Sequence, residues 1–196
     1  METIESFKSQ VAKNIRGLAA DKDIQSLSRI WCREANRSNY TYNFSWLDRP
    51  IIQYPQDIVA MQELIWQVKP DLIIETGIAH GGSLILSASM LAMVDYCEAA
   101  ATGKMLDPKM SCRRVLGVDI DIRAHNRAAI EAHPLGHKIV MIQGSSIAPD
   151  VIAEVIERSK DHKRILVCLD SMHTHEHVLA ELEAYAPLVS ADSYCV

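Results

Sequence analysis

The sequence predicts an α/β fold in which helices cover both faces of a parallel sheet. From about residue 70 onward, short apolar runs alternate with longer amphipathic segments, as they do in βαβ units. The apolar runs are continuous rather than alternating, which is typical of strands that are buried on both faces. Right-handed crossovers between such units give a doubly wound, Rossmann-like sheet.

Five segments are predicted to be strands because they are short, apolar and bounded by turn signals. They lie at 72–74, 115–118, 138–142, 165–169 and 193–196. The sequence stops inside the last of these segments, whereas a freestanding domain rarely ends within a strand. We therefore expect that Val196 is not the natural C-terminus and that the last strands of the sheet are missing.

The predicted helices lie between these strands, at about 57–68, 82–100, 122–132, 149–156 and 174–186. Asp57 is the expected N-cap of the first, and Pro70 stops that helix. Residues 57–196 are therefore predicted to form one Rossmann-like domain.

Residues 1–56 are predicted to form a helical and aromatic extension of that domain. Apolar residues three or four apart predict a helix over 1–30; they are Ile4, Phe7, Val11, Ile15 and Leu18. Residues 31–54 contain six aromatic residues among polar ones and are expected to form an ordered loop. That loop either covers an edge of the core or walls a substrate pocket, and both interpretations stay open.

Composition excludes several classes of protein. The net charge is −5 and no long basic run is present, which argues against binding to a nucleic-acid backbone. The five cysteines have no CxxC spacing, so we expect neither a zinc knuckle nor a disulfide framework. We expect a reducing, cytoplasmic location instead. No signal peptide is recognisable and no apolar run approaches the length of a membrane span, so no stable membrane insertion is expected.

The first strand leads into a loop of small residues, 75–83 (ETGIAHGGS), where a ligand of an open α/β sheet is expected to bind. Gly77, Ala79 and Gly81 let a ligand approach the backbone, and the helix that follows, beginning near Ser83, offers free N–H groups to a carboxylate. Glu75 can engage an ammonium group. Ala79 stands where a dinucleotide fingerprint has its middle glycine, which favours S-adenosylmethionine over NAD.

The next two strands also end in polar residues. Asp119 is expected to accept hydrogen bonds from both ribose hydroxyls, although it follows Glu75 by 44 residues where about 20 is usual. An insertion around 96–112 accounts for the excess, and a solvated turn aspartate is the alternative. Ser145 and Ser146 follow the third strand, where an adenine ring can be recognised. Ser146 can instead cap the next helix.

The fourth strand ends at Asp170, which can ligate a divalent cation or act as a general base. His173 and His177 are four residues apart and could share a helix face, but no third ligand stands at a zinc-site spacing. His173 is our first choice for the residue that accepts a proton from the substrate. His80 either faces the substrate or props the first loop, and we favour the second.

Several of these segments together resemble the cephalosporin hydroxylase family, over roughly residues 40–196. The similar segments are 46–57 (WLDRPIIQYPQD), 75–83, 117–121 (GVDID), 143–146 (QGSS) and 169–178 (LDSMHTHEHV). The resemblance implies a class I methyltransferase that uses S-adenosylmethionine, is similar to metal-dependent sugar O-methyltransferases, and works in surface-polysaccharide or antibiotic biosynthesis. It also implies a Mg²⁺ site with Asp170 as one ligand and two further acids just after the fifth strand, which this sequence does not reach.

The expected reaction is methyl transfer to a hydroxyl of a sugar, glycan or other small molecule. Mg²⁺ at Asp170 would lower the pKa of the hydroxyl, and His173 would take its proton. A nicotinamide-dependent oxidoreductase or epimerase and a non-catalytic, cofactor-binding scaffold are the alternatives. Self-association into a homo-oligomer is also expected, because the abrupt end of the chain leaves apolar surface uncovered.

Overall fold

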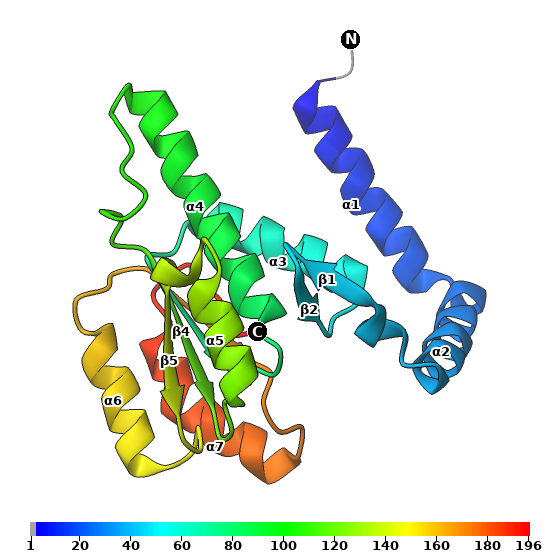
Figure 1. The fold of residues 1–196 in the computed structure, drawn as a ribbon. Helices are drawn as coiled ribbons and strands as arrows, with labels where there is room; N and C mark the ends of the chain where they lie inside the picture. The colour runs from blue at the N-terminus through cyan, green and yellow to red at the C-terminus, as the bar shows by residue number, and fades with distance from the viewer. Residues whose placement is uncertain (1–2) are drawn as a thin grey trace. The chain divides into compact units, whose positions relative to one another are not determined.

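The computed structural model describes residues 3–196 and divides into two compact units, one ending at Thr41 and one running from Tyr42 to Val196. The first unit consists mainly of helices α1 (Ile4–Ala20) and α2 (Lys22–Arg37) (Figure 1). The helix predicted over 1–30 is confirmed for residues 4–20 and 22–30 but is interrupted at Asp21, and residues 1–2 lie outside the described residues. The carboxylate of Asp21 accepts hydrogen bonds from the backbone N–H groups of Asp23 and Ile24, and it therefore ends one helix and caps the next.

The aromatic segment holds more regular structure than the predicted loop. A 3-10 turn, η1 (Tyr40–Asn43), leads into a hairpin of β1 (Phe44–Trp46) and β2 (Arg49–Ile51). Leu47 and Asp48 form its turn and both have positive φ, 45° and 68°. Two-residue hairpins favour this geometry but usually contain glycine or asparagine. The turn therefore carries no glycine signal that would have predicted the hairpin.

The core of the second unit is a four-stranded parallel sheet, in agreement with the predicted fold class. Its strands are β3 (Leu72–Thr76), β4 (Arg114–Asp119), β5 (Ile139–Gln143) and β6 (Ile165–Leu169), in the order β5-β4-β3-β6. The strand order reverses between β3 and β6, so the carboxyl ends of these two strands mark the ligand crevice of such a sheet.

The predicted fifth strand lies beside β6 in parallel but is short. Cys195 forms an isolated parallel bridge with Val167. The backbone N–H of Val196 donates to the carbonyl of Val167 at 2.9 Å, and the N–H of Leu169 donates to the carbonyl of Val196 at 2.8 Å. The last residues therefore extend the sheet past β6.

Helices cover both faces of this sheet, as predicted (Figure 1). They are α3 (Pro55–Val68), α4 (Gly82–Thr102), α5 (Ala124–Ala132), α6 (Pro149–Ser159) and α7 (His175–Tyr185), with short 3-10 turns η2 (Gly136–Lys138) and η3 (Ala186–Leu188). The predicted N-cap at Asp57 is wrong. Tyr54 is the N-cap and Pro55 opens α3, because its fixed φ suits the first helical position.

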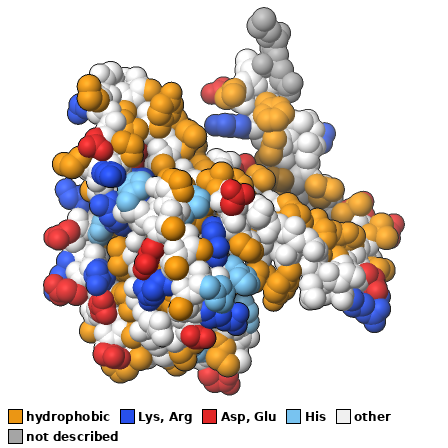
Figure 2. All heavy atoms as spheres, viewed as in Figure 1, with side chains coloured by type: hydrophobic (Ala, Val, Ile, Leu, Met, Phe, Trp, Pro, Cys, Tyr) orange, Lys and Arg blue, Asp and Glu red, His pale blue; other side chains and the backbone are white. Residues whose placement is uncertain are grey.

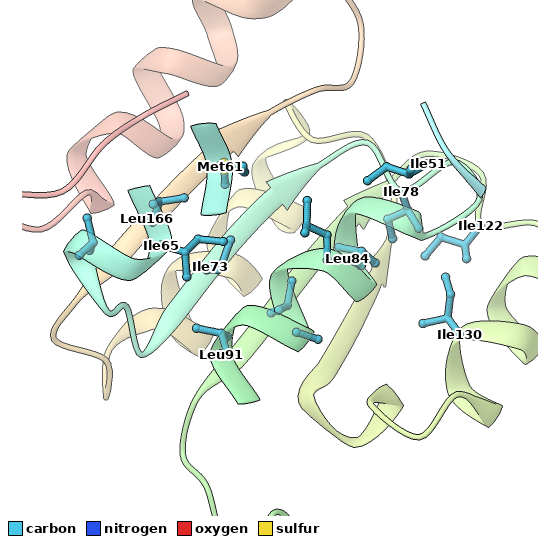
Figure 3. Packing of buried hydrophobic residues seen from close by; sticks show 14 residues of the cluster. Ile51, Met61, Ile65, Ile73, Ile78, Leu84, Leu91, Ile122, Ile130 and Leu166 are labelled. Carbon is cyan, nitrogen blue, oxygen red and sulfur yellow. The ribbon is translucent and has the colours of Figure 1, made fainter. Parts of the chain in front are cut away.

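Two hydrophobic clusters lie on opposite faces of the sheet. One joins β3 to α3, α4 and α5 through residues that include Ile65, Ile73, Leu84, Leu91 and Ile130 (Figure 3). The other joins the sheet to α6 and α7 through residues that include Leu72, Ile74, Leu116, Val155 and Tyr185. Neighbouring residues of β3 therefore point to opposite faces, which explains why Leu72, Ile73 and Ile74 are all apolar.

Helix α4 corrects the expectation that no apolar segment approaches the length of a membrane span. By length and composition alone it could cross a membrane, and it is the one such helix within residues 3–196. Half of its most apolar window is buried inside the domain. Leu84, Leu86 and Leu91 of α4 are fully buried in the cluster on β3, so the apolar residues of this helix form part of the hydrophobic core.

A buried ion cluster joins the two ends of the segment 96–112, where the sequence predicted an insertion. Asp95 on α4 accepts hydrogen bonds from Arg113 at 2.6 Å and from Lys138 at 2.7 Å. Arg113 also donates to Glu98 and to the carbonyl of Pro70. Lys138 is only 1% exposed, so its charge depends on Asp95 for compensation.

Candidate functional site

The loop after β3 has an unusual backbone that the neighbouring strand end explains. Gly77, Ala79 and Gly81 all have positive φ, 89°, 46° and 83°. A Cβ at Gly77 would lie 2.0 Å from the carbonyl oxygen of Asp170. Glycine is needed at position 77 because the backbone of Asp170, just after β6, touches the loop there. Gly77 also lines both cavities described below, and the close approach of a ligand to its backbone stays a prediction.

Asp119 at the end of β4 organises this loop. Its Oδ2 accepts hydrogen bonds from the backbone N–H groups of Ile78 at 2.7 Å and Ala79 at 3.2 Å. Its Oδ1 accepts one from the N–H of Asp121 at 2.9 Å. A carboxylate has about four lone-pair positions, so it can still accept from a ligand. The alternative of a merely solvated turn residue is wrong, and the ribose-binding role stays a prediction.

Two further side chains hold the carbonyl groups of the loop. Asn126, on α5 and 3% exposed, donates to the carbonyl of Ala79 at 2.9 Å. Arg49, on β2, donates from Nε and Nη2 to the carbonyl of His80 at 3.0 and 2.5 Å. Arg49 Nη2 also donates to Asn126 Oδ1 at 3.1 Å. Both residues escaped sequence analysis, since only the fold brings them to the loop.

Glu75 is a buried acid without a cationic partner. It is 3% exposed, and the hydroxyl of Ser83 donates a hydrogen bond to its carboxylate. Burial raises the pKa of Glu75 to about 8; the Ser83 hydrogen bond opposes this rise, and the charge of Asp170 adds to it. No Lys, Arg or His pairs with it within residues 3–196. A positively charged ligand group would therefore be stabilised here.

Two adjoining cavities lie where the strand order reverses. They share Gly77, Ala79, Asp170 and Ser171. The smaller, of about 240 Å³, is also lined by Asp119, Ser145, Ser146, Met172 and His177. The larger, of about 340 Å³, is also lined by Tyr42, residues 50–53, His80, Ser83 and His173. The predicted site residues from all four strand ends therefore gather around one crevice.

Asp170 and His173 lie close together, and both line the larger cavity. Asp170 is about half exposed, and its Oδ1 lies 3.4 Å from Nε2 of His173. Burial raises the pKa of Asp170, and the charge of His173 opposes the rise. The inference that His173 shares a helix face with His177 is wrong, because α7 begins only at His175.

Ser146 does not cap the next helix. The N-cap of α6 is Ala148, which makes no side-chain cap. The hydroxyl of Ser146 lies 3.1 Å from Nε2 of His177, and its carbonyl accepts a hydrogen bond from the hydroxyl of Tyr185 at 2.5 Å. Ser145 and Ser146 thus line the smaller cavity as predicted, while their contact with adenine stays a prediction.

Glu181 is a further residue that sequence analysis missed. It is 1% exposed, accepts a hydrogen bond from Ser171 at 2.6 Å, and lies 3.4 Å from Nε2 of His177. Leu179 and Leu182 on the same helix are 46% and 39% exposed, so α7 does not turn all of its apolar residues inward. Glu181 stands four residues before buried Tyr185, and this helical spacing was the signal for its inward position.

Comparison with known proteins decides the family. A family model described as rhamnosyl O-methyltransferase/CmcI matches residues 38–196. The chain belongs to this family. The resemblance to cephalosporin hydroxylases inferred from the loop and strand-end segments is thereby confirmed.

Curated members of the rhamnosyl O-methyltransferase/CmcI family are distant relatives. The rhamnosyl O-methyltransferase of Mycobacterium leprae (strain TN) is 30% identical over 161 residues, which cover 81% of this chain and 61% of the relative. That of Mycobacterium tuberculosis (strain ATCC 25618 / H37Rv) is 30% identical over 142 residues, covering 71% and 50%. The chain thus spans about half to three-fifths of the length of these relatives.

A solved structure confirms the fold class of this family member. The apo structure of CalS11, a TDP-rhamnose 3'-O-methyltransferase of calicheamicin biosynthesis, superposes with a TM-score of 0.51. The two are 18% identical, and the match covers 100% of this chain and 78% of that one. At this identity the likeness shows the shared α/β fold.

Proposed function

We propose that this chain forms the cofactor-binding part of an S-adenosylmethionine-dependent O-methyltransferase that acts on a sugar hydroxyl. One observation carries the proposal: an uncompensated buried acid, Glu75, lies behind a loop of fixed geometry at the reversal point of the sheet. Membership of the family and the names of its curated relatives, rhamnosyl O-methyltransferases, support sugar as the acceptor class.

The residues present suit this cofactor. When bound, S-adenosylmethionine supplies a methyl group on a positively charged sulfur. Glu75, through Ser83, would compensate the charge of its ammonium group. Asp119 and Ser145 line the smaller cavity and would contact the nucleoside, while the larger cavity adjoins them through Gly77 and Asp170. NAD has no ammonium group to match Glu75, and this favours the methyltransferase over the oxidoreductase alternative.

The same crevice would position and deprotonate the acceptor. His173 is 73% exposed at the larger cavity, so it can take a proton from a hydroxyl and pass it to solvent. Asp170, 3.4 Å away, stabilises the protonated imidazole electrostatically. The loop held by Arg49, Asn126 and Asp119 keeps the cofactor side rigid, and alignment of the reacting atoms is itself a large part of such catalysis.

Magnesium dependence stays a prediction. Asp170 provides an oxygen ligand of the kind that Mg²⁺ prefers. No group of three His, Cys, Asp or Glu side chains gathers as a metal site within residues 3–196. These residues alone therefore do not make a complete magnesium site, and no step of the proposed chemistry runs through a metal. The predicted cytoplasmic location and homo-oligomer likewise stay predictions.

Calorimetry followed by a methyl-transfer assay tests the proposal. We expect the protein to bind S-adenosylmethionine and not NAD, and to transfer radiolabelled methyl to methyl α-L-rhamnoside. His173→Ala should lower kcat by roughly 10²- to 10⁴-fold with the Kd for the cofactor unchanged. His125→Ala, at an exposed position on α5, is the matched control. Preferential NAD binding would refute the proposal, and cofactor binding without turnover at added Mg²⁺ would indicate a non-catalytic scaffold.

An Asp170→Asn variant tests the predicted Mg²⁺ dependence separately from the proposed methyl transfer. Loss of both turnover and Mg²⁺ stimulation would support Asp170 as a ligand. Unchanged turnover and unchanged metal dependence would remove Asp170 from the mechanism.

A further inference from the structure

We infer that Gln53 is a specificity-determining residue: its side-chain amide accepts a hydrogen bond from a hydroxyl of the acceptor sugar, next to the hydroxyl that is methylated. This inference rests on the proposed function. It assigns the larger cavity to a monosaccharide ring and names the side chain that selects its orientation.

The first support is an unsatisfied oxygen. Oε1 of Gln53 is buried and has no hydrogen-bond partner within residues 3–196. Gln53 also lines the larger cavity, together with Asp170 and His173. Buried polar atoms are nearly always hydrogen-bonded, because leaving one unpaired costs free energy. A ligand hydroxyl that donates to this oxygen would remove that cost.

The second support is the chemical division of the cavity lining. Pro50, Ile51 and Ile52 provide an apolar stretch next to Gln53, and Tyr42 adds an aromatic side chain that is 61% exposed. Hydroxyl, imidazole and carboxylate groups come from the loop and from the end of β6; they are Ser83, His80, His173 and Asp170. A sugar ring has apolar C–H faces and polar hydroxyl edges, and a lining of this kind fits both.

The third support is the fixed position of the segment that carries Gln53. Ile51 is 1% exposed and packs in the core cluster with Ile78 (Figure 3). A Cβ at Gly82 would lie 2.2 Å from the carbonyl oxygen of Pro50, so α4 and β2 touch without space between them. Arg49 ties the same strand to His80 of the loop. Gln53 is therefore held in a constant place relative to the cofactor loop, as selection of one hydroxyl requires.

Binding measurements on the full chain test this inference without turnover. The probes are methyl α-L-rhamnoside and its monodeoxy analogues, titrated into protein saturated with S-adenosylhomocysteine. Gln53→Met keeps the length of the side chain and removes its polar atoms, and Gln53→Glu keeps an acceptor oxygen. Gln56→Met, at an exposed position of α3 three residues away, is the matched control. Thermal unfolding establishes that each variant is folded.

We expect Gln53→Met to weaken rhamnoside binding by roughly 5- to 100-fold, and Gln53→Glu and Gln56→Met to weaken it by less than about threefold. One deoxy analogue should bind wild type and Gln53→Met equally, because it lacks the donated hydroxyl. The Kd for S-adenosylhomocysteine should not change. Equal rhamnoside affinity in wild type and Gln53→Met would overturn the inference.

Two other outcomes would also overturn it. A parallel loss of S-adenosylhomocysteine affinity would place Gln53 on the cofactor, and failure of wild type to bind any rhamnoside would remove the sugar from the cavity. Rhamnoside binding that depends on Gln53, but without methyl transfer, would refute the proposed function and leave the inference standing.

Discussion

The hydroxyl of Ser83 donates a hydrogen bond to the buried carboxylate of Glu75, eight residues earlier in the chain. Glu75 is the last residue but one of β3, while Ser83 lies in the first turn of α4 and lines the larger cavity. The pair therefore connects an acid in the interior to the place where a ligand would bind. Burial holds the pKa of that acid at about 8.

Cofactor binding should release a proton. Below pH 8 the Glu75 carboxyl of the free protein is mostly protonated, because its pKa is about 8. A bound ammonium group favours the charged form and lowers that pKa, so about one proton should leave near pH 7. Calorimetric titration with S-adenosylmethionine in buffers of different ionisation enthalpy measures this release.

Glu75→Gln is the variant that checks the source of the proton. It should abolish the release and weaken cofactor binding, whereas Glu98→Gln, at a half-exposed ion pair, should change neither. The wild-type protein should also lose stability as pH rises from about 4.5 to about 8, because the folded state holds a proton that the unfolded state has lost. Proton release that persists in Glu75→Gln would contradict this assignment.

Removing the guanidinium of Arg49 should loosen the cofactor loop. Arg49→Met loses the bonds to the His80 carbonyl and to Asn126, and hydrogen bonds from charged groups contribute about 1.5–3 kcal/mol each. We expect the Kd for S-adenosylmethionine to rise about tenfold or more, with faster amide exchange over residues 77–81. Arg127→Met, which breaks a long helix-surface ion pair with Glu131, should shift stability by less than about 1 kcal/mol. If Arg49→Met and Arg127→Met changed the Kd and the amide exchange equally, the Arg49 contacts would not be what holds the cofactor loop.

A methyl group at Gly77 should be poorly tolerated. Gly77→Ala combines a positive φ of 89° with a Cβ that would stand 2.0 Å from the backbone oxygen of Asp170. Left-handed strain of about 1–2 kcal/mol adds to overpacking of about 1–3 kcal/mol. Gly103→Ala also has a positive φ, 65°, but nothing lies within 4 Å of its Cβ, so only the strain should remain. Chemical denaturation measures the free energy of unfolding of both variants. A similar decrease in the two would contradict the importance of the close contact between Gly77 and the carbonyl of Asp170.

Neutralising Asp95 should strongly destabilise the domain. Asp95→Asn leaves Lys138, 1% exposed, without its compensating charge, and breaking a buried ion pair in this way costs about 3–5 kcal/mol. Burial raises the pKa of Asp95, but the hydrogen bonds from Lys138 and Arg113 outweigh it and the pKa is lowered overall. The stability from this pair is therefore present above the unfolded pKa near 4 and is lost as pH falls below it.

Glu98, a less buried acid of the same ion cluster, is the control for Asp95→Asn. Glu98 is 43% exposed and shares Arg113, so Glu98→Gln should cost less than about 1 kcal/mol in urea denaturation. A loss as large as that of Asp95→Asn would mean that burial does not set the contribution of each acid.

The sequence by itself determined the four main strands, their alternation with helices and the residues at each strand end. Buried strands such as β3 and β6 are short apolar runs, and the helices have a different spacing of apolar residues, so each can be recognised from a window of local sequence. Asp119 and Asp170 were predicted site residues because polar residues that directly follow buried strands must lie at the same edge of a parallel sheet.

Only the tertiary structure decided which side chains hold the cofactor loop and which line the acceptor side. Arg49 and His80 are 31 residues apart, and Asn126 and Ala79 are 47 apart, so no local pattern links them. The turn at Leu47 and Asp48 adopts positive φ without glycine, and the carbonyl of Leu47 lies 3.1 Å from Nε2 of His133, 86 residues away. Strand order, close backbone contacts and unpaired buried atoms depend on contacts between distant segments, and such contacts exist only once the chain has folded.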